Sequence, residues 1–204
     1  MSFVWLRPIL LSLAVLVWPV CFPAAEPVAG GSFLTGQLLV ATPEIRDWRF
    51  QETVILIVRH DAEGALGIVI NKPIGNPPLA QLLDSIGQDS DGITGRVRLF
   101  YGGPLHPEIG FILHSADYHG AHSIGIDNRL AMTNSADILR DIAQGRGPAK
   151  QLVAFGHAGW GPGQLDDEMA HGVWYTAPAD PAMVFDEDRD GLWERAMARR
   201  TTPL

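Results

Sequence analysis

Cysteine is almost missing from this sequence: Cys21 is the only one in 204 residues. Because it lies in the apolar N-terminal segment, a mature chain that has lost this segment could form no disulfide bond. Catalysis by a thiol nucleophile and zinc binding by several cysteines are excluded on the same ground. The stability of the folded chain must therefore come from its apolar core.

Lysine is scarce as well, and the arginines form no basic stripe. Lysine occurs only at positions 72 and 150, and the arginines of residues 189–200 alternate with acidic residues. The formal net charge is -8 and the sequence pI is about 5.2. Because this field repels phosphate backbones, we expect no direct nucleic-acid partner.

The first 25 residues differ from all that follow. Arg7 is their only charge, and residues 9–22 are apolar except for Ser12. Such a run is short for a membrane span and is typical of a secretory signal. We predict a signal segment at residues 1–25, a linker at 26–31, and export to the periplasm, with membrane contact only through the N-terminal segment.

Three alternatives for this segment remain open. Cleavage after Ala25 would place Pro23 at the minus-three position, which fits the A-x-A pattern poorly, so the segment could stay as an anchor. Cys21 could carry a lipid, although bulky residues precede it. If the start site is wrongly assigned, the protein would be cytoplasmic.

Residues 32–204 have the length and apolar content of one domain with one core, since 47% of the chain is hydrophobic. Short runs rich in Val, Ile and Leu predict strands, and apolar residues at helical spacing predict helices. The predicted strands are 33–41, 53–60, 65–71, 97–101, 109–114, 123–133, 150–155, 173–176 and 183–185, and the predicted helices are 79–86, 136–144, 164–170 and 191–199. Strands follow one another more often than they alternate with helices, which favours an α+β fold.

A glycine-rich stretch, QLVAFGHAGWGPGQLDDEMAHGVW at residues 151–174, predicts a strand, a tight loop and a helix. Gly159, Gly161 and Gly163 could adopt positive φ or allow a close approach of another backbone. The stretch lacks the G-x-G-x-x-G spacing of dinucleotide-binding loops, and no lysine follows as in a P-loop. We therefore interpret it as a structural turn or a contact for an uncharged ligand, with Trp160 and Gln164 as the side chains most free to meet it.

Two acidic or histidine-rich clusters resemble metal sites incompletely. Residues 186–191 place aspartates and a glycine at positions one, three, five and six of a calcium loop, but position twelve is Met197, so we interpret them as caps of the last helix. His114, Asp117, His119 and His122 match no helical ligand pair and are interpreted as part of a polar connector. We predict no metal and no cofactor.

Several motifs together resemble the AlgH/YqgE family of bacterial proteins. They are FLTGQLLVATPEIRDWRFQETVILIVRH, GALGIVINKP, YGGP, the Thr133-x-Ser135-x-Asp137-x-Leu139 segment, GHAGWGPGQLDDE and Trp193-x-x-Ala196, and they run from about Phe33 to Ala198. The resemblance implies a single α+β domain with a bifurcated, mostly antiparallel, partly barrel-like sheet flanked by helices.

The resemblance implies little about chemistry. Members of the family carry the label of transcriptional regulator, but no helix-turn-helix is readable here and the acidity argues against direct DNA contact. This chain departs from the family pattern at His157, where members often have an aromatic residue. It also departs in its signal-like N-terminus, because the family is usually cytoplasmic.

No G-x-S-x-G elbow or other catalytic set is present, so no catalytic residue is assigned. We predict a non-enzymatic binding or regulatory module whose partner is a protein or a small ligand. Its surface would form where strand-ending loops converge, at Asn71, Lys72, Gly102, Gly103, Pro104, His157, Trp160 and Gln164. The alternative is an enzyme or small-ligand protein using the same cleft near the NKP, GGP and AGWxxGQL loops, with His157 or Asp166 as base and Lys72 as anion partner.

Overall fold

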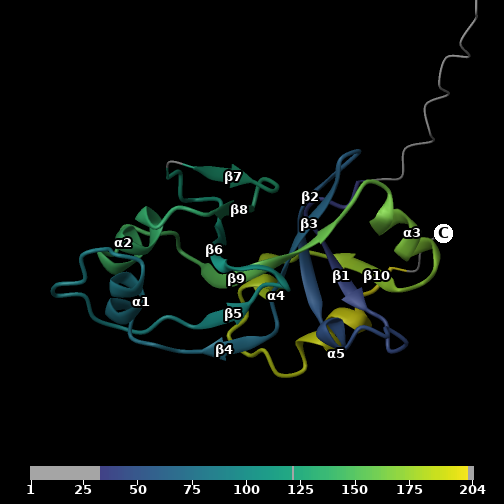
Figure 1. Cartoon of the computed structure of the whole chain (residues 1–204), viewed down its shortest axis with the longest axis horizontal. Coiled ribbons are helices and arrows are strands. Elements are labelled where there is room, and N and C mark those ends of the chain that lie inside the picture. Colours follow the sequence, from purple (N-terminus) through teal and green to yellow (C-terminus); the bar gives the residue numbers. More distant parts are fainter. Residues whose placement is uncertain (1–32, 121, 202–204) are drawn as a thin grey trace, which may run out of the picture. The chain divides into compact units, whose positions relative to one another are not determined.

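The computed structural model describes residues 33–120 and 122–201 (Figure 1). The predicted signal segment at 1–25, the linker at 26–31 and Cys21 lie outside the described residues. Within the described ranges, no helix combines the length and the apolar character that crossing a bilayer requires.

Ten strands and five α-helices form in this part of the chain. The strands are β1 (Gln37–Ala41), β2 (Val54–Asp61), β3 (Gly64–Val69), β4 (Pro73–Gly75), β5 (Leu99–Tyr101), β6 (Leu105–Ser115), β7 (Ser123–Gly125), β8 (Leu130–Thr133), β9 (Gln151–Trp160) and β10 (Trp174–Pro178). The helices are α1 (Leu79–Ser85), α2 (Asp137–Ala143), α3 (Gln164–Ala170), α4 (Pro181–Val184) and α5 (Leu192–Ala198), with a 3-10 helix η1 (Trp48–Phe50).

Strand β9 holds the two halves of the sheet together. Along one edge it pairs antiparallel with β6, and the other edge is shared between β3, at residues 158–160, and β5, at residues 153–155. The main path runs β10-β1-β2-β3-β9-β6-β8-β7, and only the β5 pairing with β9 is parallel among the strand pairs of the described residues. In Figure 1, β9 passes from the half containing β4 to β8 into the half containing β1 to β3 and β10. The predicted α+β fold with a bifurcated, mostly antiparallel sheet is confirmed.

The sheet divides at a glycine kink in β9. Gly156 has φ +75°, and a Cβ built on it would lie 2.3 Å from the carbonyl oxygen of Gly103. Gly103 has φ +149°, and its Cβ would lie 2.1 Å from the carbonyl carbon of His157. A side chain at either position would collide with the backbone of the other segment. The close approach of these two segments therefore requires glycine at both positions.

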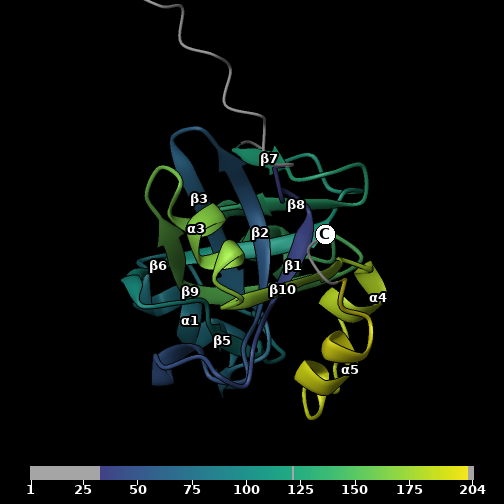
Figure 2. The same ribbon diagram turned by 90° about the vertical axis from the view of Figure 1, so that its right-hand side faces the viewer.

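Opposite faces of the β1–β2 sheet are covered by different helices. Leu38, Val40 and Leu56 belong to one core cluster with Leu192 and Ala196 of α5. Their neighbours in the strands, including Leu39, Ala41, Ile55 and Ile57, belong to a second cluster with Leu165 of α3. This alternation is the period of two that a strand imposes on its side chains, and Figure 2 shows α3 and α5 on the two flanks of these strands. A third cluster packs α1 and α2 against β6 and β9.

Two predicted strands take other forms. The segment predicted as a strand at 183–185 is largely helix α4, because Pro181 starts the helix and the Asp180 carboxylate accepts a hydrogen bond from the Ala182 N–H. The single strand predicted at 123–133 is a hairpin of β7 and β8. Asp127 turns the chain there, since its carboxylate accepts from the N–H groups of Arg129 and Leu130.

The acidic loop before α5 does not cap that helix, so the predicted capping role is wrong. Helix α5 begins after Gly191, which has φ +68°, and no side chain caps it. Instead Arg195 reaches back to the loop, with its Nη2 3.2 Å from an Asp186 carboxylate oxygen and its Nη1 3.6 Å from Asp188. Over residues 33–120 and 122–201, no group of three potential ligands could hold a metal ion.

Candidate functional site

The residues predicted to form one site lie near the two ends of β3. Ala65, at the start of β3, pairs with Trp160, whereas Asn71 follows the end of the same strand. A separation of six strand residues corresponds to about 20 Å. The strand-ending loops therefore do not converge at one place as predicted.

Near the end of β3, the predicted residues serve the backbone. The Asn71 side-chain oxygen accepts from the Val54 N–H at 2.9 Å, and its amide nitrogen donates to the Glu52 carbonyl at 2.8 Å. The Lys72 carbonyl accepts from the Tyr101 N–H, and Val69 N–H donates to the Gly102 carbonyl. The Asn71 amide is thus already occupied in tying β2 to the end of β3.

His157 lies just past the kink of β9 and is half-buried. Its ring stacks on His106 with centroids 5.6 Å apart and meets Phe111 edge-on at the same distance. Its Nδ1 is buried without a hydrogen-bond partner. Burial, and to a smaller extent the charge of His106, lower the pKa of His157, so its neutral form is favoured.

At the start of β3, three predicted residues line one groove. Pro104, Trp160 and Gln164 border a space of about 790 Å³ between residues 42–50 and the segment from the end of β9 to β10. We call this the aromatic groove, because Phe50, Trp160 and Trp174 form part of its wall. Its volume lies in the range of pockets that hold small ligands or an inserted side chain.

Glu168 organises the wall of the aromatic groove. One of its carboxylate oxygens accepts from the indole N–H groups of Trp160 at 2.9 Å and Trp174 at 2.7 Å, and the other accepts from Gln164 at 2.8 Å. The two indole rings meet edge-to-face with centroids 6.0 Å apart. The carboxylate thereby satisfies the two aromatic donors that the interior would otherwise leave unpaired.

The predicted freedom of Trp160 is wrong, since its side chain is only 7% exposed. Strand β9 continues to residue 160, so Trp160 follows the strand alternation and points into the core. Gln164 is exposed, but its side-chain oxygen accepts from the Gly161 N–H. Of Gly159, Gly161 and Gly163, only Gly163 has a positive φ, +71°, directly before α3.

The other wall of the groove comes from residues 42–50, which sequence reasoning did not single out. Here Asp47 caps η1 and holds Arg49 in an ion pair at 2.6 Å. The side-chain hydrogen bond from Arg49, and to a smaller extent the charge of Arg49, lower the pKa of Asp47. Leu105, which lines the groove, is 44% exposed. Trp48 lies in sequence between Asp47 and Arg49, which both line the groove, but its own side chain is 78% exposed and borders the neighbouring depression that contains Lys72. The one sequence signal that could have indicated this wall is a tryptophan, Trp48, between two charged residues in a stretch without helical or strand periodicity.

The residues of the enzymatic alternative do not meet in the aromatic groove. Asp166 faces His60, with its carboxylate oxygen 3.6 Å from Nε2 of that buried ring. Lys72 lines a separate depression together with Trp193, and neither Lys72, Asp166 nor His157 borders the aromatic groove.

The chain resembles known proteins over nearly all of the described residues. The family model described as AlgH-like (DUF179) matches residues 38–204. A UPF0301 protein of Methylococcus capsulatus is 41% identical over 175 residues, which cover 86% of this chain and 96% of that relative.

Two solved structures share the architecture. The solution structure of the AlgH protein from Pseudomonas aeruginosa has a TM-score of 0.71 and 35% identity, over 84% of this chain and 90% of that one. The crystal structure of a Corynebacterium diphtheriae protein has a TM-score of 0.67 and 25% identity, over 85% and 90% of the two chains.

Proposed function

The chain belongs to the AlgH-like family, and within it we propose that the protein is a non-enzymatic binding module that holds a protein partner at the aromatic groove. The observation that carries the proposal is the combination of an aromatic wall with exposed apolar side chains, Leu105 on the rim and Trp48 in the adjoining depression, next to the groove-lining Asp47 and Arg49. A regulatory role would then act through protein contact.

The charges along the groove favour an apolar anchor over an ionic ligand. Arg49 is held by Asp47, and Glu168 already accepts from both indoles and from Gln164. A small charged ligand would have to compete with these bonds, and the other two charged residues of the lining, Glu44 and Arg46, are of opposite sign. An apolar side chain would instead replace water along the aromatic wall, which is favourable in proportion to the area covered.

Trp48 is suited to be the main contact residue. Tryptophan is enriched among the residues that dominate binding energies at protein interfaces, and its loss there costs about 2 kcal/mol or more. Its 78% exposure in the isolated chain leaves nearly the whole indole available to a partner. Leu105 would extend this contact across the rim of the groove.

A photoreactive side chain in place of Trp48 tests the proposal in cells. We expect irradiation to yield an adduct with a defined protein that the same probe in place of Ile124, an equally apolar and 59% exposed residue of β7, does not yield. With the purified partner, Trp48→Ala should weaken binding by about 30-fold, since 2 kcal/mol corresponds to that factor, while Ile124→Ala should leave it unchanged.

Identical adducts from positions 48 and 124, or equal affinities for Trp48→Ala and wild type, would contradict the proposal. Circular dichroism of both variants checks that the fold is retained. Turnover of a small molecule that is lost on mutating the groove would favour the enzymatic alternative instead.

A further inference from the structure

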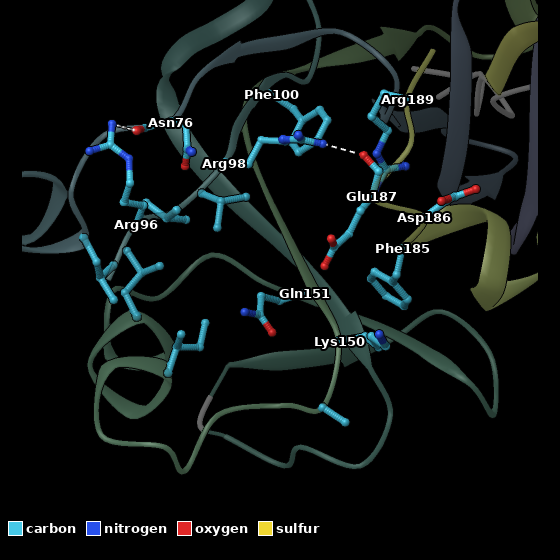
Figure 3. Close-up of a pocket in the computed structure, with 16 residues that line it drawn as sticks. Asn76, Arg96, Arg98, Phe100, Lys150, Gln151, Phe185, Asp186, Glu187 and Arg189 are labelled. Atoms are coloured by element: carbon cyan, nitrogen blue, oxygen red, sulfur yellow. Dashed lines mark hydrogen bonds between the residues drawn. The ribbon is translucent and has the colours of Figure 1, made fainter. Parts of the chain in front are cut away.

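A second cavity, away from the aromatic groove, gathers positive charge in this acidic protein. It has a volume of about 440 Å³, and its lining includes Arg96, Arg98, Lys150 and Arg189 (Figure 3). These side chains come from the segment before β5, the residue just before β9 and the loop between α4 and α5. We call it the cationic cavity, and it shares no lining residue with the aromatic groove.

The arginines of the cavity are oriented but not neutralised. Arg98 donates to the carbonyl oxygen of Glu187 at 2.5 Å, Arg189 donates to that of Val184 at 3.0 Å, and Arg96 donates to a main-chain carbonyl as well. A carbonyl carries no formal charge, so these bonds fix the guanidinium groups while leaving their charge uncompensated. Within residues 33–120 and 122–201, none of the cavity's cations forms an ion pair.

Arg189 is the most constrained of these cations. Its guanidinium carbon lies 5.0 Å from the centre of the Phe100 ring, and its Nε is buried without a hydrogen-bond partner. Burial lowers the pKa of Arg189 to about 10; the charge of Asp186 opposes this shift, and the nearby charge of Arg98 adds to it. The group stays charged at neutral pH, and a bound anion would relieve both effects.

Two carboxylates also border the cavity and do not cancel its charge. Asp186 is held by Arg195 at 3.2 Å, and the side chain of Glu187 projects into the space between Arg98 and Gln151 in Figure 3. Four cationic side chains against two carboxylates leave an excess of two positive charges. The rest of the wall combines apolar side chains, among them Val97 and Val153, with the amides of Asn76 and Gln151.

From this arrangement we propose that the cationic cavity binds a small phosphate monoester that carries a compact apolar body. A phosphate monoester has a charge of about −1.5 to −2 at pH 7, which matches the excess charge of the lining. Guanidinium groups present paired N–H donors that fit phosphate oxygens. The apolar wall would contact the rest of the molecule, and the volume is in the range of small-ligand sites.

Calorimetric titration of the full chain with phenyl phosphate tests this site. We expect saturable binding, weaker binding of inorganic phosphate, which lacks the apolar body, and no binding of phenol, which lacks the charge. Benzoate, a monoanion, should bind at least tenfold more weakly than phenyl phosphate. Affinity for phenyl phosphate should fall between pH 7.5 and 5.5, because its second pKa is about 6.

Three variants identify the site. Arg98 is exposed, so Arg98→Gln removes its charge without disturbing the core and should weaken binding at least tenfold. Glu187→Gln removes the repelling carboxylate and should tighten binding severalfold. Arg200→Gln is the matched control for Arg98→Gln, because Arg200 is likewise exposed and donates to a main-chain carbonyl, but lies outside the cavity.

Unchanged affinity in Arg98→Gln, or equal affinity for phenyl phosphate and benzoate, would overturn the proposal. Absence of saturable binding up to about 1 mM phenyl phosphate would do the same, since it limits the binding free energy to less than about 4 kcal/mol. Neither result bears on the aromatic groove, because the two sites share no residue.

Discussion

His114 is a buried structural histidine, although its sequence neighbours indicate an exposed polar connector. It was grouped with Asp117, His119 and His122 as part of a polar connector, but it lies on β6 and is 0% exposed. Its Nδ1 donates to the Ser115 carbonyl at 2.9 Å, and its Nε2 lies 3.0 Å from the Thr133 hydroxyl. This hydroxyl is in turn 2.7 Å from that of Ser123. The imidazole therefore links β6 to the β7–β8 hairpin.

The stability of the protein should fall as pH drops from 7 to 5. Burial lowers the pKa of His114 below its ordinary value of 6.5, and the pKa of His157 is lowered as well. Below pH 6.5 the unfolded chain takes up protons that the folded chain does not, so unfolding becomes more favourable. In urea titrations, His114→Gln should flatten this dependence and cost about 1–3 kcal/mol at pH 7.

Exposed Ile124, on the same β7–β8 hairpin, provides the control for this experiment, because Ile124→Ala removes no titratable group and should leave the pH dependence as in wild type. A slope that is the same in His114→Gln and wild type would show that His114 takes up its proton at the same pH in the folded and unfolded states, and would contradict the prediction.

At the scale of elements, the kink of β9 depends on Gly156, the one glycine of this strand with a positive φ. Gly156→Ala would hold alanine at φ +75° and push its Cβ against the Gly103 carbonyl. The left-handed conformation alone costs about 1–2 kcal/mol, and the collision adds to it. We expect a loss of at least about 2 kcal/mol in the free energy of unfolding, measured by urea titration.

Gly125→Ala in β7 is the matched control, since that position has no positive φ and its Cβ would meet nothing within 4 Å. It should leave stability within about 0.5 kcal/mol of wild type. Equal stability of Gly156→Ala and Gly125→Ala would mean that β9 can straighten without cost.

The elements themselves were largely predictable, and their local exceptions have physical causes. The four predicted helices and the hairpin of β2 and β3 follow from apolar spacing, which burial enforces. The apolar run at 183–185 carries no such period. The segment becomes helical because Asp180 and Pro181 begin a helix just before it. The kink at Gly156 could not be read from the sequence, because it depends on a backbone crossing some fifty residues away in the chain.

At the scale of the whole molecule, family motifs and strand order were sufficient for the fold but not for the site. The motifs around Asn71 and Gln164 are both correctly placed next to strand ends. Asn71 follows the end of β3, and Gln164 follows the end of β9. Because β3 and β9 are antiparallel, the end of β9 lies beside the start of β3, so the two motifs lie at opposite ends of β3. The aromatic groove and the cationic cavity both depend on segments distant in sequence, such as residues 42–50 and Arg189, and no local pattern connects them.

Export remains a proposal for the whole chain, motivated by the apolar segment at residues 9–22. We expect the protein in the periplasmic fraction, with an N-terminus near Glu26 when it is sequenced from separated cell fractions. Mass spectrometry of the same sample distinguishes a lipid on Cys21 from simple cleavage. An intact Met1 start in the cytosol would contradict the proposal.

The position of β9 along the chain also governs when the protein can fold during synthesis. Neither half of the sheet can close before residue 160 has left the ribosome, because β3, β5 and β6 all pair with β9. Strand β1 must wait still longer for β10 on its outer side. Such long-range pairing folds slowly, so most of the chain must be synthesised before the sheet can form. The export proposed above requires this delay, because a secretion channel accepts an unfolded chain.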